Sequence, residues 1–234
     1  MAETGTAVIS TAVIAHIRSD FATKFGVPRQ SGVVPETQAA IVFEPPYRVP
    51  EALRGLESFS HLWLLWHFSE VRQTGWSPTV RPPRLGGNAR MGVFATRSPY
   101  RPNPIGLSSV KLLGIDLHTP DGPVLRVAGA DLMDGTPILD IKPYLPYTDS
   151  HPEAAGGFTA GLEGERLAVS CPEALLSAVP NPNPYLERGK KLLVYDPSVH
   201  DYRTDKPQWV EILPGHFIYG NERELDGYRK ELTL

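Results

Sequence analysis

The sequence predicts a mainly β protein: a small closed antiparallel β-barrel followed by a smaller α+β unit. Two observations favour this fold class. The chain has 24 prolines and 21 glycines in 234 residues, which indicates many turns and short elements because proline interrupts helices and central strands. Short apolar or β-branched runs separated by turn residues also recur through residues 11–150, as expected for a barrel of six or seven strands.

The first half of the predicted barrel contains three strands. Residues 11–18 (TAVIAHIR) are β-branched and apolar, and residues 39–44 (AAIVFE) form a second run that ends at a proline pair. Pro50 then occupies a favourable first position for one or two turns of helix. Residues 60–68 (SHLWLLWHF) are almost continuously apolar, which predicts a central strand buried on both faces.

The second half of the predicted barrel contains three more strands. Residues 108–116 (SSVKLLGID) and 123–130 (PVLRVAGA) flank a turn at 120–122. The pair Asp134-Gly135 predicts a tight turn that leads into a strand at 137–142 (PILDIK). These elements complete a barrel rather than the alternating strands and helices of a doubly wound sheet.

The predicted domain organisation has four parts. Residues 1–10 form a flexible lead-in, 11–150 the barrel domain, 151–165 a linker and 166–234 the small α+β domain. In the last part, helices are expected at PEALLSAV and YLERGKKLLVYD, and strands at QWVEIL and HFIYG.

Composition excludes several classes of protein. No apolar run is long enough to span a bilayer and no signal-peptide pattern is present, so we expect a cytoplasmic protein with no membrane partner. A single cysteine, Cys171, rules out an internal disulfide and a cysteine-based metal cage. His61 and His67 are six residues apart without an acidic or cysteine companion, so no metal is expected.

Residues 71–115 form a basic segment rich in proline. The segment has no Asp or Glu, although the whole chain has a net charge of −3. Its cations are Arg72, Arg81, Arg84, Arg90, Arg97, Arg101 and Lys111. The prolines of residues 81–111 favour a shaped loop system over a helix, and the charge favours anion binding. Alternatively, the arginines cap carbonyl groups and pair with acids from elsewhere in the chain.

Five strings within residues 13–150 resemble the TrmO-type (YaeB-like) tRNA methyltransferases. They are IRSDFATKFGVPRQSG, LRGLESFSHLW, GWSPTVRPPRLGGNARMG, GVFATRSPYRPNPIGLSSVKL and DGTPILDIKPYLPY. The resemblance implies a homodimeric β-barrel enzyme that uses S-adenosylmethionine to methylate N6 of threonylcarbamoyladenosine, immediately 3′ of the anticodon in tRNA. The glycine-rich turn and later acidic residue of a doubly wound methyltransferase are not evident.

The resemblance also implies the residues that bind the cofactor. A planar cation suits the carboxylate of S-adenosylmethionine and a carboxylate suits its ribose, while adenine takes backbone groups beside an apolar wall. The implied residues are Pro28, Arg29, Gln30, Ser69, Glu70, Arg97, Asp131, Leu132, Met133 and Asp134. From the residues alone, Pro28–Gln30 could be a plain connecting loop, and Asp134 could satisfy its own backbone in a hairpin turn.

The remaining candidates concern the acceptor. The N6 atom of threonylcarbamoyladenosine is urea-like and a poor nucleophile, so a residue that orients it or takes its proton is expected among Asp140, Tyr144 and Tyr147. The candidates for RNA binding are Arg81, Arg84, Arg90, Tyr100, Arg101 and Lys142. Tyr100 would stack on an extruded base, or else pack under the loop at Pro102.

Two other functions compete with the methyltransferase. A non-catalytic RNA-binding barrel would need the basic loops but no carboxylates facing a nucleoside pocket. A hydrolase is disfavoured, because Ser98, Ser108 and Ser109 lack a nucleophile-elbow context and no histidine stands in a triad frame.

Overall fold

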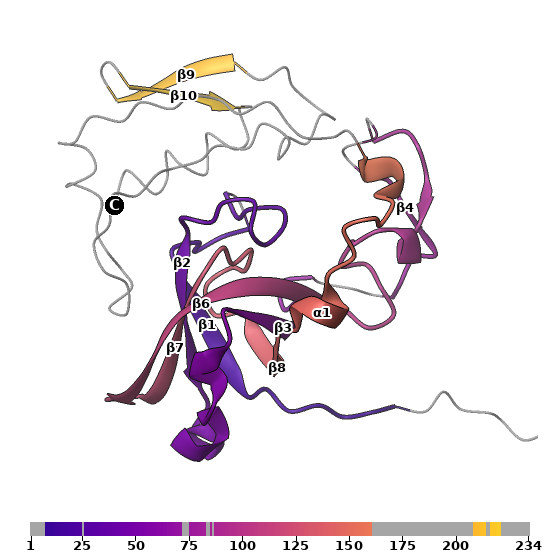
Figure 1. Cartoon of the computed structure of the whole chain (residues 1–234). Coiled ribbons are helices and arrows are strands. Elements are labelled where there is room, and N and C mark those ends of the chain that lie inside the picture. The colour runs from indigo at the N-terminus through magenta and orange to yellow at the C-terminus, as the bar shows by residue number, and fades with distance from the viewer. Residues whose placement is uncertain are drawn as a thin grey trace, which may run out of the picture.

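The computed structural model describes residues 8–24, 26–71, 75–82, 85 and 87–160, together with the backbone of 208–213 and 216–220. Figure 1 shows the described barrel, with the remaining residues drawn as a grey trace.

Six antiparallel strands close into a barrel in the order β1-β2-β7-β6-β3-β8. The strands are β1 (Ala15–Ser19), β2 (Gln38–Phe43), β3 (His61–His67), β6 (Ile105–Thr119), β7 (Gly122–Ala128) and β8 (Pro137–Pro143). The predicted fold class is therefore confirmed. The predicted turn before β8 is also confirmed, because Gly135 adopts a φ of 74° that glycine tolerates readily.

The core lies inside the barrel and is built from alternate residues of each strand. On β3, Leu62, Leu64 and Trp66 are buried, whereas the residues between them are only half-buried. The prediction that this strand is buried on both faces is therefore wrong. A barrel wall has one inner face, and on the outer face the Trp63 indole is held by Asp149, whose Oδ2 accepts its N–H at 2.8 Å.

One end of the barrel is covered by short 3₁₀ turns. They are η1 (Pro45–Tyr47), η2 (Pro50–Leu53) and η3 (Leu56–Ser58), between β2 and β3. The helix predicted from Pro50 is thus one short 3₁₀ turn, and Gly55, with a φ of 87°, separates it from the next. The buried Leu53 side chain joins the core. The β6–β7 turn and the end of β8 lie at this same end, as the antiparallel register requires.

The opposite end, here called the loop end, carries three longer connections: 20–37, 68–104 and 129–136. The second of these contains β4 (Thr79–Val80) and β5 (Met91–Gly92), which pair with each other, and η5 (Val93–Ala95). The predicted loop system is therefore confirmed for its described residues, except that β6 already begins at Ile105. In Figure 1 the 20–37 connection arches over this end of the barrel.

Beyond β8 lie α1 (Pro146–Asp149) and η6 (Gly157–Thr159), the latter within the predicted linker. In the predicted C-terminal domain, β9 (Gln208–Leu213) and β10 (His216–Gly220) pair as an antiparallel hairpin, which confirms both predicted strands. The two predicted helices and Cys171 lie outside the described residues. Among the described residues, no helix has the length and apolar character needed to cross a membrane.

Candidate functional site

Backbone hydrogen bonds join two of the three connections at the loop end. Gly32 N donates to Gly129 O at 2.8 Å, and Gly129 N donates to Thr37 O at 2.8 Å. Further along, Asp134 N donates to Phe21 O at 2.8 Å. The 20–37 connection therefore lies directly against the 129–136 connection, although about 100 residues separate them in sequence.

The third connection joins them through a side-chain contact. Arg97, which follows η5, donates a hydrogen bond from Nη1 to Gln30 Oε1. Beside Gln30, Pro28 is buried and Arg29 is half-buried. The structure thus brings together predicted cofactor residues from two distant segments.

Asp131 is the most enclosed carboxyl group at the loop end among the acids whose surroundings are described. Its Oδ1 accepts a 2.5 Å hydrogen bond from Ser108 Oγ, and Ser108 Oγ lies 3.0 Å from Trp66 Nε1. The indole N–H can only donate, so Ser108 accepts from Trp66 and directs its own proton at Asp131. This chain of bonds favours the ionised carboxylate in a fixed orientation.

Burial acts against that ionisation. Desolvation raises the pKa of Asp131 above its ordinary value of 3.8, and the Ser108 hydrogen bond is the largest opposing effect. Backbone N–H groups at Asp131 and Ser31 and the charge of Arg97 also lower it, but burial prevails. Asp131 is therefore a carboxyl group whose charge is sensitive to its surroundings, as is typical of functional sites.

Ser108 was not among the predicted site residues, and Trp66 was assigned only to the core strand. Ser108 lies opposite Leu64 in the β3–β6 register, is 1% exposed and faces the barrel interior. A serine between the inward-facing Gly106 and Val110 was the available signal. Gly106 belongs to the same arrangement, because a Cβ atom there would lie 2.2 Å from the Trp66 ring.

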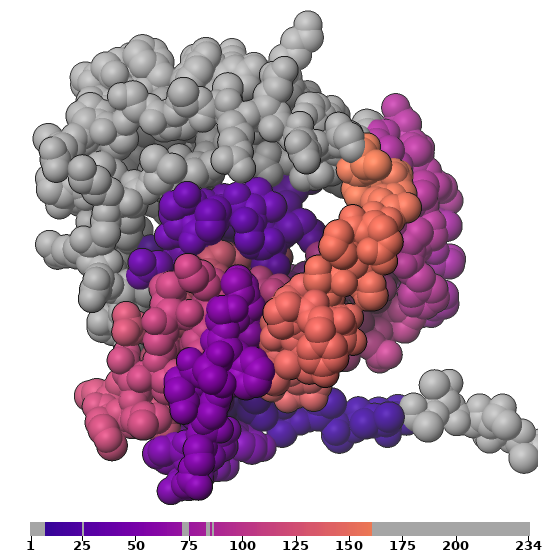
Figure 2. Space-filling model, in the orientation of Figure 1, coloured from indigo at the N-terminus to yellow at the C-terminus, as the bar shows by residue number. Residues whose placement is uncertain are grey.

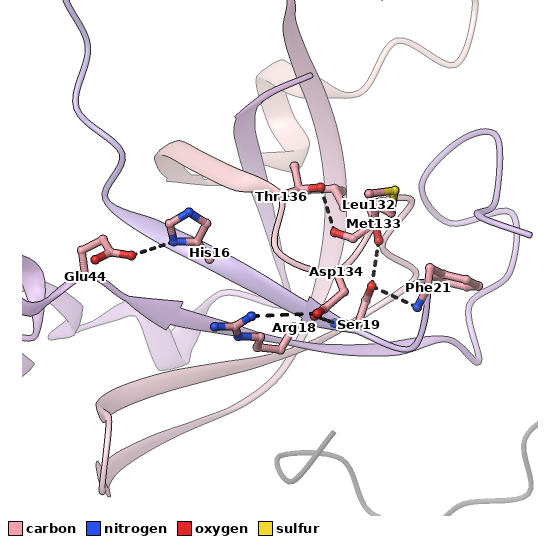
Figure 3. A network of polar contacts seen from close by, with 9 residues as sticks. All are labelled: His16, Arg18, Ser19, Phe21, Glu44, Leu132, Met133, Asp134 and Thr136. Atoms are coloured by element: carbon pink, nitrogen blue, oxygen red, sulfur yellow. Dashed lines mark hydrogen bonds and ion pairs between the residues drawn. The ribbon is translucent and has the colours of Figure 1, made fainter. Parts of the chain in front are cut away.

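Asp134 lies on a separate network, shown in Figure 3. Its Oδ1 accepts from Ser19 N at 3.0 Å and its Oδ2 lies 3.9 Å from Arg18 Nη1. Ser19 Oγ in turn donates to Leu132 O at 3.0 Å. Asp134 thus ties the 129–136 connection to β1 through a bond to a residue 115 positions away, which differs from the alternative in which it satisfies its own backbone in a hairpin turn.

Leu132 and Met133, between the two aspartates, differ in burial. Leu132 is 1% exposed and its side chain belongs to the core, so it would face a ligand through its backbone. Met133 is half-buried, and its carbonyl accepts from Thr136 Oγ1 at 2.8 Å (Figure 3). Ser69 and Glu70 are exposed just beyond β3, where Phe68 N donates to Pro104 O at 2.9 Å, and so they also lie at the loop end.

The residues predicted to act on the acceptor nitrogen lie on β8 or just after it. Asp140, on β8, pairs with Lys142 at 2.8 Å. Tyr144 packs against Trp63, with ring centroids 5.5 Å apart, and Tyr147 in α1 is 87% exposed. Because β8 runs from the loop end to the other end, the single chain does not bring these tyrosines to Asp131 and Arg97.

Of the six predicted RNA-binding residues, Lys142 lies on β8, where it pairs with Asp140, and the other five lie in the basic segment. Arg81 and Arg90 are exposed in the basic segment, and Tyr100 is 51% exposed. Arg101 is half-buried and donates through Nη1 to Thr96 O at 2.7 Å, as in the alternative of carbonyl capping. Arg84 lies outside the described residues. Within the described part of the chain, no group of three His, Cys, Asp or Glu residues could hold a metal ion.

Comparison with known protein families identifies the family that shares this barrel and its loop end. The model of the tRNA-methyltransferase O (TrmO) N-terminal domain matches residues 16–150, which include the six barrel strands except Ala15 and all three loop-end connections. The chain belongs to the TrmO family. The resemblance seen in the sequence is thereby confirmed.

Relatives within the TrmO family include well-separated organisms. A protein from Escherichia coli (strain K12) named tRNA (adenine(37)-N6)-methyltransferase is 51% identical over 157 residues, which are 67% of this chain and 66% of that protein. A human protein of the same name is 40% identical over 150 residues, or 63% of this chain and 32% of the human protein. The aligned part thus spans less than two thirds of both relatives.

Solved TrmO structures share the fold. A crystal structure of TrmO is 42% identical and covers 65% of this chain and 64% of its own, with a TM-score of 0.54. A crystal structure of TrmO from Pseudomonas aeruginosa is 39% identical and covers 70% of this chain and 68% of its own, with a TM-score of 0.57.

Proposed function

We propose that this TrmO-family chain is an S-adenosylmethionine-dependent methyltransferase that methylates N6 of adenine 37 in tRNA, with the adenine in its threonylcarbamoyl form. One observation carries the proposal. The loop end gathers a cation, an amide and a half-buried carboxyl group from distant segments, namely Arg97, Gln30 and Asp131. Related proteins of the family are named tRNA (adenine(37)-N6)-methyltransferases.

The donor set at the loop end fits S-adenosylmethionine. Arg97 offers a planar guanidinium for its carboxylate, and Asp131 offers an acceptor for its ribose hydroxyls. The half-buried Met133 adds apolar surface against which an adenine ring could pack. When bound, S-adenosylmethionine supplies an electrophilic methyl group on a sulfonium.

The surrounding residues hold these groups in place before a ligand arrives. Ser108, fixed by Trp66, prevents the Asp131 carboxylate from rotating, and Gln30 restrains the Arg97 guanidinium. A group that is already oriented loses little conformational entropy on binding. Gln30, Arg97 and Asp131 therefore form a preorganised cradle at the loop end, in which Asp131 is anchored to β6 and β3 through Ser108 and Trp66.

Catalysis at N6 depends mainly on position and on removal of a proton. Good alignment of reacting groups contributes on the order of 7 kcal/mol or more, and a positioned base about 10²- to 10⁴-fold in rate. Asp140, Tyr144 and Tyr147 are the candidates for the second role. Tyr144 and Tyr147 lie at the opposite end of β8 from the cradle. We therefore propose a homodimer in which the second copy of the chain supplies these tyrosines to the cradle.

The RNA would be bound by the basic segment and held at its anticodon arm. Arg81 and Arg90 are exposed and suited to phosphate contacts. Replacing one phosphate-binding arginine by alanine should flatten the dependence of binding on salt by about 0.7 to 0.9 log units per log unit of salt concentration.

Calorimetric titration with S-adenosylmethionine tests the donor site. The wild type should bind, Arg97→Ala and Asp131→Asn should bind more weakly, and Arg126→Ala, which removes a wall arginine paired with Asp116 at 2.9 Å, should bind like the wild type. Methyl transfer is then measured with tRNA from cells that lack the modification. A folded wild type that binds tRNA but neither binds nor uses S-adenosylmethionine would instead indicate a non-catalytic RNA-binding barrel.

A further inference from the structure

Two exposed aromatic side chains stack on each other within the basic segment. Trp76 and Phe94 have ring centroids 6.3 Å apart and planes inclined by 24°. Trp76 is 52% exposed and Phe94 is 72% exposed. Large aromatic rings contribute to folding by being buried, so a stacked pair left open to solvent has surface available for a ligand. We call this pair the aromatic platform.

The backbone directs the aromatic platform outward. Val93 and Phe94 are neighbours in η5, and Val93 is 1% exposed whereas Phe94 is turned to solvent. Val93 N donates to Pro78 O at 3.0 Å, which fixes η5 beside the strand that follows Trp76. In Figure 2 the magenta segment that contains these residues forms an outer face beside the barrel. The exposure therefore follows from a fixed local fold.

A cation borders the aromatic platform. The Arg101 guanidinium carbon lies 5.9 Å from the Phe94 ring centroid. Nη1 of Arg101 donates to Thr96 O at 2.7 Å, so the guanidinium is held in position rather than swinging freely. Beside it lies an open hollow of about 210 Å³, lined by Phe94, Arg101, Pro102 and Asn103. This volume is below the roughly 300–1,000 Å³ typical of pockets for drug-sized ligands, so the hollow suits a smaller chemical group.

The charge of the surroundings indicates the chemistry of the ligand. Residues 71–115 contain no acid, and Arg81 and Arg90 are exposed within that segment. Sites for single-stranded nucleic acid combine open aromatic rings with a positive groove, and an acid-free surface with several arginines attracts a polyanion. Charge complementarity therefore favours RNA over a protein partner.

We propose that the aromatic platform stacks on unpaired bases of the tRNA anticodon loop, at a second site made of residues other than the Gln30, Arg97 and Asp131 of the cradle. The inference rests on the proposed function for the identity of the RNA. Phe94 and Trp76 bind base faces, and Arg101 contributes a cation at the edge of the stack. Such contacts depend on base exposure more than on sequence, because every base presents a π-face.

Binding of a labelled anticodon stem-loop RNA, followed by fluorescence anisotropy with the full chain, tests the aromatic platform. Trp76→Ala and Phe94→Ala should each raise Kd by about 5- to 150-fold, the range for loss of one base–aromatic stack. Trp76→Phe keeps a ring and should retain most of the affinity. Tyr47→Ala, which removes a 39% exposed ring at the other end of the barrel, should have no effect. A blunt duplex of the same stem should bind all variants equally.

Three results would overturn the inference. One is an unchanged Kd in both alanine variants that unfold at the wild-type temperature. Another is equal weakening for the stem-loop and the duplex. The third is a change in sedimentation of the RNA-free protein in both alanine variants, which would make the platform a protein interface. Calorimetry with S-adenosylmethionine separates the two proposals. If the wild type binds S-adenosylmethionine but the alanine variants of the platform bind RNA unchanged, only this inference is defeated. If those variants lose RNA affinity but the wild type does not bind S-adenosylmethionine, only the proposed function is defeated.

Discussion

The barrel wall and the loop end are stabilised in different ways. In the wall, many buried apolar side chains contribute to stability, because alternate residues of neighbouring strands fill one continuous core. At the loop end, single hydrogen bonds connect residues that are distant in sequence, such as Ser108 with Asp131 and Ser19 with Asp134. The wall therefore tolerates exchange among apolar residues, whereas the loop end depends on the identity of individual residues.

The largest effect is expected within the wall, at Leu64. This side chain is fully buried, so Leu64→Ala should lower the free energy of unfolding by about 2–5 kcal/mol, from reduced burial and the cavity left behind. Leu65→Ala, on the outer face of the same strand, should cost much less. Urea denaturation of both variants measures the difference, and equal losses would contradict the one-sided burial of β3.

A smaller loss of stability is expected from Ser108→Ala, together with a loss of function. Removing the hydroxyl leaves the Trp66 N–H without its acceptor, at a cost of about 1–3 kcal/mol, and frees Asp131 to rotate. Affinity for S-adenosylmethionine should fall by about tenfold, the equivalent of 1.4 kcal/mol. The control is Ser109→Ala, because only the backbone N–H of Ser109 bonds to Ser31, at 3.2 Å. Equal affinities of the two variants for S-adenosylmethionine would show that Ser108 does not support the cofactor site.

Asp131 should make stability fall as pH rises on the acidic side. Its pKa in the folded protein is raised, so the folded state keeps a proton that the unfolded chain releases near 3.8. Stability then decreases from about that pH up through the raised pKa, at no more than about 1.4 kcal/mol per pH unit. Urea denaturation across acidic pH should show this slope, and Asp131→Asn should remove it. An unchanged slope in the variant would assign the effect to other groups.

Asp149, at the opposite end of the barrel, should show the reverse dependence and the smallest effect. The Leu145 N–H and then the Trp63 indole hold the pKa of this carboxyl group below its ordinary value of 3.8. Its stabilising contribution is therefore present above that value and is lost as pH falls through the lowered pKa. Asp149→Asn should flatten the acidic end of the stability profile. The comparison with Asp131→Asn tests whether the two ends respond to acid with opposite signs.

The sequence was most informative about the wall. Turn residues and apolar runs predicted the barrel and the places of all six strands, since each strand depends on a local pattern. The degree of burial on β3 was not predictable in the same way. Continuous apolarity does not distinguish a strand between two layers from one whose outer face is covered by a short segment such as α1.

The loop end was accessible mainly through family resemblance. Arg97 and Gln30 are 67 residues apart, so neither residue predicts their contact without knowledge of the barrel closure. The role of Ser108 was missed because it depends on the β3–β6 register, which sets the serine beside the Trp66 indole. The assignments of individual cofactor, acceptor and RNA residues remain predictions.

Trp66, whose ring packs against Gly106, also serves as a spectroscopic reporter inside the barrel. The indole is only 8% exposed, and one serine hydroxyl links it to the Asp131 carboxyl group. Its N–H resonance should therefore shift when Asp131 gains a proton or a ligand. The chain has four tryptophans, so single substitutions can assign that signal. Occupancy of the cradle can then be followed in solution without a label.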